Sequence, residues 1–159
     1  MHKIMRLVDI VLDRVGESYI FEMARSRKEA KTLITGLSSP VVQHLIKLFV
    51  FNSPVNKAHW IKEINQWLNQ IDDIYLKPSN KKPDWQTIYN WMVYDSSPHY
   101  SAEYIDGRVQ KWLGGDYQGI QVYDYDAELV LNQILRILER VAKDISIPNK
   151  FRSITEYLD

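Results

Sequence analysis

Apolar residues recur every three or four positions along most of the chain, which is the spacing of one face of an α-helix. The first such stretch covers residues 4–15 and predicts a helix that ends at Gly16. Ser18 is placed to cap a second helix that runs to about Thr35, and Gly36 is expected to end it.

The next stretch, residues 40–51, is apolar on nearly every side. Ser39 and Pro40 have the order of an N-cap followed by proline at the first helical position, so a new helix is expected to begin there. A helix without a polar face is usually surrounded by other helices, and we therefore expect residues 40–51 to form the central helix of the domain.

Four further helices are expected, at about residues 57–72, 84–94, 101–113 and 126–143, and a short one is expected at 150–158. Asn56 and Asp126 are read as caps, and Asp84 or the residue before it is expected to start the helix at 84–94. Residues 116–125 have a weak strand character and are expected to form an ordered loop. The pattern predicts an all-α, single-domain bundle of about seven to eight helices spanning residues 1–159, with residues 77–83 as the best candidate for a subdomain boundary.

Composition agrees with one intracellular domain. The chain has 159 residues, a length that suits a single core, and it contains no cysteine. Disulfides and cysteine-ligated metals are therefore excluded, and a reducing compartment is favoured. Asp9 and Asp13 interrupt the apolar positions near the start, so a signal peptide is not expected. We expect a cytoplasmic protein.

Charge is balanced overall but unevenly distributed. Lys and Arg together number 20, as do Asp and Glu, so the net charge is zero. Residues 1–57 carry nine basic and five acidic side chains, whereas residues 96–130 carry two basic and six acidic ones. A neutral chain with an acidic segment is a poor general nucleic-acid binder, and it suits a basic partner better. A regulator that contacts nucleic acid through the basic residues 25–31 is the first alternative.

No catalytic motif is apparent. The chain has no glycine-rich phosphate loop, no nucleophile elbow and no zinc-protease helix motif, so neither catalysis nor a cofactor is expected. One constellation keeps an enzymatic alternative open. His59 and Glu63 share a helical face, and His44 lies on the preceding helix, so together they have the ligand types of a divalent metal site.

Aromatic residues gather in the second half of the chain, where 10 of the 19 lie between Trp85 and Tyr125. Within this region one short segment mixes tyrosines with carboxylates and contains no Lys or Arg. Tyrosine buries large area at low entropic cost, and carboxylates steer basic partners. We therefore predict that this segment binds a protein partner through Asp116, Tyr117, Tyr123, Asp124, Tyr125, Asp126 and Glu128. The alternative is a capped loop whose tyrosines pack on the core and whose carboxylates are solvated.

A resemblance adds to this picture. His44-Leu45-Ile46-Lys47, followed by Trp60 and Glu63-Ile64, resembles the His-Leu-(Leu/Ile)-Lys … Trp … (Glu)-Ile pattern of the DUF-twenty-nine family, small helical bacterial proteins of unknown function. The likeness covers about residues 25–74. It implies a helical fold and a bacterial origin, and it supplies no functional residues.

In general build the chain also resembles bacterial immunity proteins, which are small, cytosolic, non-catalytic and often acidic where they meet a basic toxin. The expected function is therefore binding of a protein partner, in the concrete form of neutralising a toxin such as a nuclease. An exposed aromatic patch could equally pair with a second copy of the chain, so self-association stays open.

Overall fold

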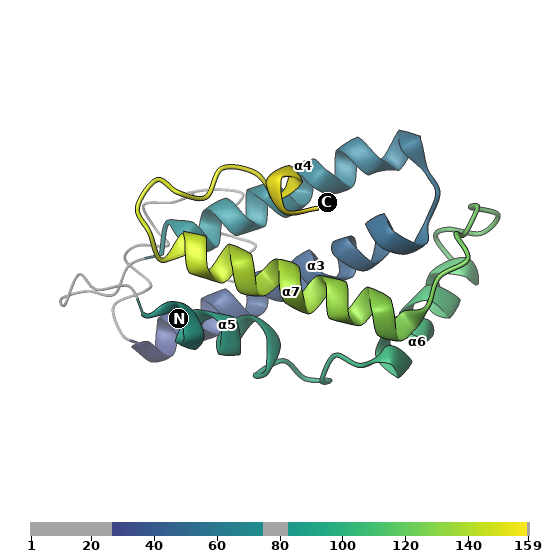
Figure 1. Cartoon of the computed structure of the whole chain (residues 1–159). Coiled ribbons are helices and arrows are strands. Elements are labelled where there is room, and N and C mark those ends of the chain that lie inside the picture. Colours follow the sequence, from purple (N-terminus) through teal and green to yellow (C-terminus); the bar gives the residue numbers. More distant parts are fainter. Residues whose placement is uncertain (1–26, 75–82, 159) are drawn as a thin grey trace, which may run out of the picture.

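A computed structural model describes residues 27–74 and 83–158, and within them the chain is mostly helical. Five α-helices and one 3-10 helix are present in these ranges, and no β-strand is (Figure 1). They are α3 (Arg27–Val50), α4 (Pro54–Asp72), α5 (Trp85–Val93), α6 (Ala102–Leu113), α7 (Ala127–Ile145) and the 3-10 helix η2 (Ile154–Tyr157). The all-α prediction is confirmed. The expected helix at residues 4–15 and the boundary candidate at 77–83, apart from Pro83, lie outside the described residues.

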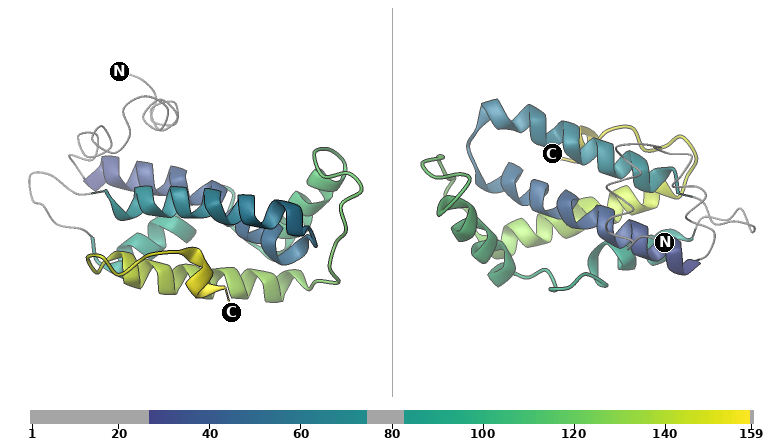
Figure 2. Two further views of the ribbon diagram at one scale, coloured as in Figure 1. Left: turned by 90° about the horizontal axis from the view of Figure 1, so that it is seen from above. Right: turned by 180° about the vertical axis from the view of Figure 1, so that it is seen from behind.

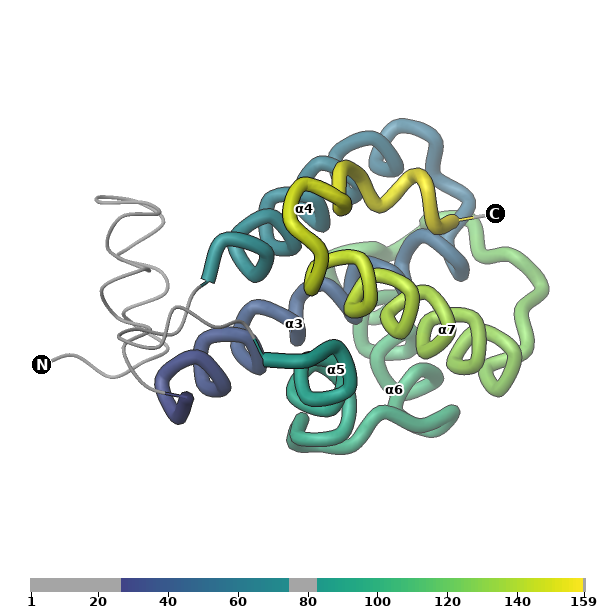
Figure 3. Tube along the Cα trace, turned by 60° about the vertical axis from the view of Figure 1, so that its left-hand side comes forward, coloured from purple at the N-terminus to yellow at the C-terminus, as the bar shows by residue number. Residues whose placement is uncertain are grey.

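Helix α3 is the centre of the bundle and packs against α4, α5, α6 and α7. It forms an antiparallel pair with α4, and α7 runs back along it on the other side (Figures 1 and 2). Helices α5 and α6 follow one another along the side of the α3–α7 pair (Figure 3), and η2 covers α4 and α7. The core takes apolar side chains from all five α-helices.

The predicted break between the second and third helices was wrong. Gly36, Ser39 and Pro40 lie inside α3, and the expected central helix at residues 40–51 is the second half of this longer helix. The predicted count of seven to eight helices is accordingly not matched. The buried positions explain the continuity, because they keep their helical spacing across the supposed break at Ala30, Leu33, Ile34, Leu37, Val41, Val42, Leu45 and Ile46.

Burial and side-chain hydrogen bonds stabilise residues 35–40 of α3, where glycine, serine and proline occur within the helix. Pro40 has no N–H to donate to the Gly36 carbonyl, and a proline in a helix interior costs about 3 kcal/mol. The Ser38 hydroxyl donates to the Ile34 carbonyl at 2.7 Å, and the Thr35 hydroxyl donates to the Trp91 carbonyl of α5 at 3.1 Å. Tertiary packing therefore outweighs the local helix-breaking residues.

By length and composition alone, α3 could also cross a membrane, and 56% of its most apolar window is buried within the bundle. A core helix meets the same criterion, so this property does not distinguish the two.

Local signals placed α5, α6 and α7 closely. Asp84 and Asp126 cap α5 and α7 through their carboxylates. Helix α4 begins earlier than expected, with Ser53 as N-cap and Pro54 in the first turn, so Asn56 is not its cap. The last expected helix, at residues 150–158, is the single 3-10 turn η2.

Candidate partner-binding surface

The segment predicted to bind a partner lies mostly in a loop of residues 114–126 between α6 and α7, at the end of the bundle where α3 stops and α4 begins (Figures 1 and 2). Its last residue, Glu128, lies in the first turn of α7. The loop backbone pairs with residues 50–52, where α3 ends. Phe51 and Val122 form an antiparallel bridge, the Tyr123 N–H donates to the Val50 carbonyl at 2.8 Å, and the Asn52 N–H donates to the Gln121 carbonyl at 2.9 Å. The prediction of an ordered loop is thereby confirmed.

Tyr117 attaches the start of this loop to the core. Its ring lies 5.5 Å from that of Phe51 and 5.8 Å from that of Trp60, centroid to centroid. Together with Trp60 and Trp112 it encloses the ammonium of Lys47, which lies 5.0 Å from the Tyr117 centroid, 5.1 Å from Trp112 and 5.9 Å from Trp60. Cation–π attraction of this kind strengthens as the cation loses water, and Lys47 is only 9% exposed. We call these four residues the Lys47 cage.

Two of the predicted site residues fix the other end of the loop. The Tyr125 hydroxyl donates to an Asp106 carboxylate oxygen of α6 at 2.7 Å, and burial, followed by the Asp106 hydrogen bond and charge, raises the pKa of Tyr125 to about 12. The Asp126 carboxylate accepts from the N–H groups of Glu128 and Leu129 at 2.9 and 3.2 Å. Tyr125 and Asp126 therefore position the loop through their polar groups, as Tyr117 does through its ring.

The remaining four predicted residues face solvent. Asp116, Asp124 and Glu128 are exposed, and the Tyr123 side chain is 49% exposed with its hydroxyl donating to the Asn52 side-chain oxygen at 3.3 Å. The structure thus separates the seven predicted residues into three that hold the loop and four that are accessible.

Two exposed apolar side chains that the sequence reading missed lie at the same end of the molecule. Val55, in the first turn of α4, is 89% exposed, and Leu129, in the first turn of α7, is 62% exposed. Both lie off the buried stripe of their helices, and this is the signal that could have found them. We define the acidic end surface as Val55, Asp116, Tyr123, Asp124, Glu128 and Leu129.

The metal-site alternative is partly met by the structure, because its three residues come together between α3 and α4. One Glu63 carboxylate oxygen lies 2.9 Å from Nε2 of His44 and 3.2 Å from Nε2 of His59. In the part of the chain that the structure describes, however, no group of three or more His, Asp or Glu side chains is placed to hold a metal ion. The arrangement is a hydrogen-bonded contact between two helices.

The protonation of His44 is constrained on both sides of its ring. Nδ1 lies 2.9 Å from the Pro40 carbonyl, which can only accept, so Nδ1 carries a proton. Nε2 faces the Glu63 carboxylate at 2.9 Å, so with Nδ1 protonated this second bond forms only in the charged imidazolium. Burial, and then the positive charge of Lys47, nevertheless lower the pKa of His44 below its ordinary 6.5, against the raising effect of Glu63 and Pro40.

The basic side chains of the nucleic-acid-binding alternative are less available than the sequence suggested. Arg25 and Ser26 lie outside the described residues. Arg27 stacks over Trp91 at 5.5 Å, and Lys31 pairs with Asp95 at 3.4 Å. Two of the three cations described at the start of α3 are therefore engaged within the molecule.

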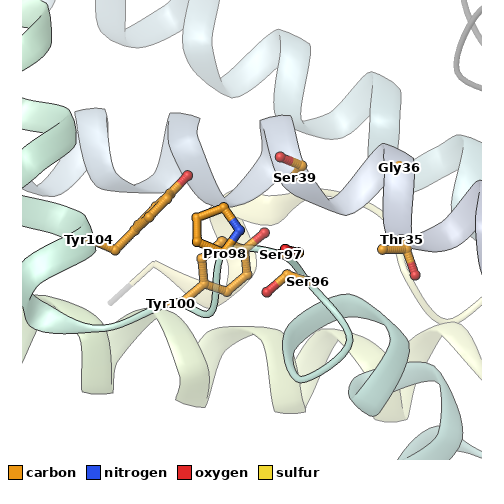
Figure 4. A pocket seen from close by; sticks show the side chains of 8 residues that line it. All are labelled: Thr35, Gly36, Ser39, Ser96, Ser97, Pro98, Tyr100 and Tyr104. Carbon is orange, nitrogen blue, oxygen red and sulfur yellow. The ribbon is translucent and has the colours of Figure 1, made fainter.

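A separate cavity of about 230 Å³ lies between α3 and the α5–α6 connection (Figure 4). Its lining is uncharged and rich in hydroxyl groups: Thr35, Gly36, Ser39, Ser96, Ser97, Pro98, Tyr100 and Tyr104. The Ser96 hydroxyl already donates to the Val93 carbonyl at 2.9 Å, and that of Thr35 to Trp91. The Thr35 hydroxyl thus joins α3 to α5, whereas the Ser96 hydroxyl bonds within its own turn. No titratable pair suited to catalysis lines the cavity.

Comparison of the chain with protein-family models, with curated proteins and with solved structures finds no match. The resemblances to the DUF-twenty-nine family and to immunity proteins therefore stay predictions.

Proposed function

We propose that this protein is a non-catalytic, cytoplasmic protein-binding module that uses the acidic end surface. The observation that carries the proposal is the ordered loop 114–126, which has no regular secondary structure and is nevertheless attached at both ends and in its middle. Irregular connections of this length are uncommon in compact domains and are usually functional. A loop already ordered before binding loses little further entropy on association.

Charge and exposure support the same proposal. The loop contains no Lys or Arg, and Asp116, Asp124 and Glu128 project carboxylates into solvent beside the apolar side chains of Tyr123 and Leu129. Exposed apolar groups rimmed by charge are typical of interaction surfaces. A partner with a basic surface would be steered by the carboxylates and would bury the apolar groups.

In its concrete form the proposal is an immunity protein that binds and neutralises a toxin, for instance a nuclease whose active site is basic. Carboxylates held at fixed positions can occupy the place of nucleic-acid phosphates. The rival function, a nucleic-acid-binding regulator acting through the start of α3, is less favoured because Arg27 and Lys31 are already engaged.

The test is a pull-down from the native host with the full chain, analysed by mass spectrometry and including the product of the neighbouring gene. The proposal expects a stoichiometric partner with a basic domain. Changing Asp116 and Asp124 to lysine should slow association with that partner about tenfold at low salt and less at high salt.

Glu139→Lys is the charge-reversal control, because Glu139 lies in the second half of α7, away from the loop, and pairs at the surface with Lys143 at 3.8 Å. Equal loss in the control and in the double variant would contradict the assigned surface. A nucleic acid bound at low salt without any protein partner would favour the rival.

A further inference from the structure

A hollow adjoins the acidic end surface at Tyr123, the one residue that belongs to both. A cavity of about 180 Å³ lies beside Tyr123, where α3 turns into α4. Its lining is mixed: Leu48, Phe51, Pro54 and Tyr123 contribute apolar groups, and Asn52, Ser53 and Lys57 contribute polar ones. We call it the Tyr123 hollow. It is smaller than the roughly 300 Å³ at which small-molecule sites begin, so its size suits one inserted side chain.

The walls of the hollow are held in place by contacts already described. Tyr123 is fixed through its N–H to Val50 and through its hydroxyl to Asn52, and Phe51 is 2% exposed and packs in the core against Trp60 and Trp112. The hollow is therefore preformed. Preformed pockets that receive a single buried side chain are where binding energy concentrates at protein interfaces.

The charges around the hollow are asymmetric. On the loop side, Asp124 follows Tyr123 directly, and Asp116 and Glu128 are exposed nearby in sequence. On the α4 side, Lys57 contributes to the hollow itself, and Val55 is exposed in the same first turn. A partner residue that enters the hollow thus meets Lys57 on the α4 side, and the exposed Asp124 adjoins Tyr123 in the chain on the loop side.

We propose that the partner inserts one large apolar side chain into the Tyr123 hollow and places basic side chains on the loop side, against Asp124. This inference rests on the proposed function and specifies how its surface recognises a partner. It also adds Leu48, Pro54 and Lys57, on the α3–α4 turn, to the interface. Lys57 then has two effects: its aliphatic stem can cover the inserted group, while its charge opposes a basic partner.

The experiment is selection of a random peptide library, displayed on phage, against the full chain, with counter-selection against the Tyr123→Ala chain. The expected peptides combine one Phe, Leu or Met with neighbouring Lys or Arg. Synthetic versions should lose about tenfold in affinity on Tyr123→Ala and on Leu48→Phe, which fills the hollow from α3. Asp124→Lys should weaken binding, and Lys57→Glu should tighten it severalfold.

Thermal melts of each variant show whether the fold persists. If Tyr123→Ala loosens the loop, Leu48→Phe still tests the hollow, because Leu48 lies on α3 and the loop sequence is unchanged. Glu139→Lys again serves as control and should change nothing. Selected peptides that are acidic, that lack an apolar residue or that ignore both hollow variants would overturn the inference. So would a library that yields no peptide preferring the unmodified chain.

Analytical ultracentrifugation of the chain and of its Tyr123→Ala variant tests whether a second copy of the chain occupies the hollow. Dimers that dissociate on Tyr123→Ala would show that a second copy of this chain occupies the hollow, and the basic partner would then be wrong. The two proposals fail separately. If a natural basic partner is captured and Leu48→Phe does not change its affinity, the proposed function is retained and the role of the hollow is rejected. If peptides are selected but no natural partner is captured, the hollow is retained as a binding site and the proposed function is rejected.

Discussion

The middle of α3 and the loop 114–126 are ordered for opposite reasons. Residues 36–40 of α3 contain glycine, serine and proline, yet they stay helical because apolar neighbours on both sides are buried. The loop has no helical or strand register, yet it is held by a few specific contacts, foremost the Lys47 cage. Packing thus keeps α3 helical although its local sequence disfavours a helix. The loop is ordered by side-chain and backbone contacts although it has no regular secondary structure.

The largest effect is expected where the loop meets the core. Replacing Tyr117 with alanine removes one face of the Lys47 cage and its contacts with Phe51 and Trp60. We expect the free energy of unfolding to fall by about 2–3 kcal/mol, measured by urea denaturation. Amide exchange at Tyr123 and Asn52 should accelerate more than exchange within α5. Unchanged exchange at those two amides would show that the loop is held without the cage.

The complementary change tests α3. Pro40→Ala restores an N–H that can donate to the Gly36 carbonyl. We expect a gain of about 1–2 kcal/mol in the free energy of unfolding, because the regained helical hydrogen bond outweighs the greater freedom of the unfolded chain. Calorimetric melting measures the gain. A loss instead would mean that the proline has a packing role that alanine cannot replace.

A smaller effect is expected at the junction of the loop with α7. Asp126→Ala removes the acceptor for two N–H groups of the first turn, which should cost about 1 kcal/mol. Asp126→Asn is the matched variant, since it keeps an acceptor and should restore most of the stability in the same denaturation experiment. Equal losses in both would assign the effect to charge rather than to capping.

The smallest effect concerns pH. His44 has a lowered pKa in the folded protein, so below pH 6.5 the unfolded chain binds the proton first. Its contribution to the free energy of unfolding is therefore complete above that pH and declines as the pH falls from 6.5 toward the folded value. Comparing chemical denaturation of the wild type and His44→Gln across this range isolates the contribution. Glu63→Gln removes the main group that raises the pKa of His44, so it should make the decline steeper.

How far the sequence could predict the structure depends on how local each cause is. Asp84 and Asp126 cap helices through atoms two or three residues away, so α5 and α7 were placed closely. The break at Gly36 was mispredicted because breakers are local signals, and burial across α3 is decided by four other helices. The uninterrupted spacing from Leu33 to Val42 was the available counter-signal.

The candidate site divides in the same way. The sequence could mark an acidic, tyrosine-rich segment, because composition shows it directly. It could not show that Tyr117 packs around Lys47, since the two residues are joined only by the fold. It did bring His44, His59 and Glu63 together as an alternative, because helical spacing relates two of them, but the hydrogen bond of His44 to Pro40 and the burial that lowers its pKa required the structure.

The Lys47 cage also has a thermodynamic consequence for binding. It joins α3, α4, α6 and the loop in one contact, so the loop is not a separable appendage and its detachment loosens the bundle. A ligand that binds only the attached loop is then linked to folding of the whole domain. A partner present at 100 times its dissociation constant should stabilise the entire chain by about 2.7 kcal/mol, so the melting temperature of the domain itself reports occupancy of the surface.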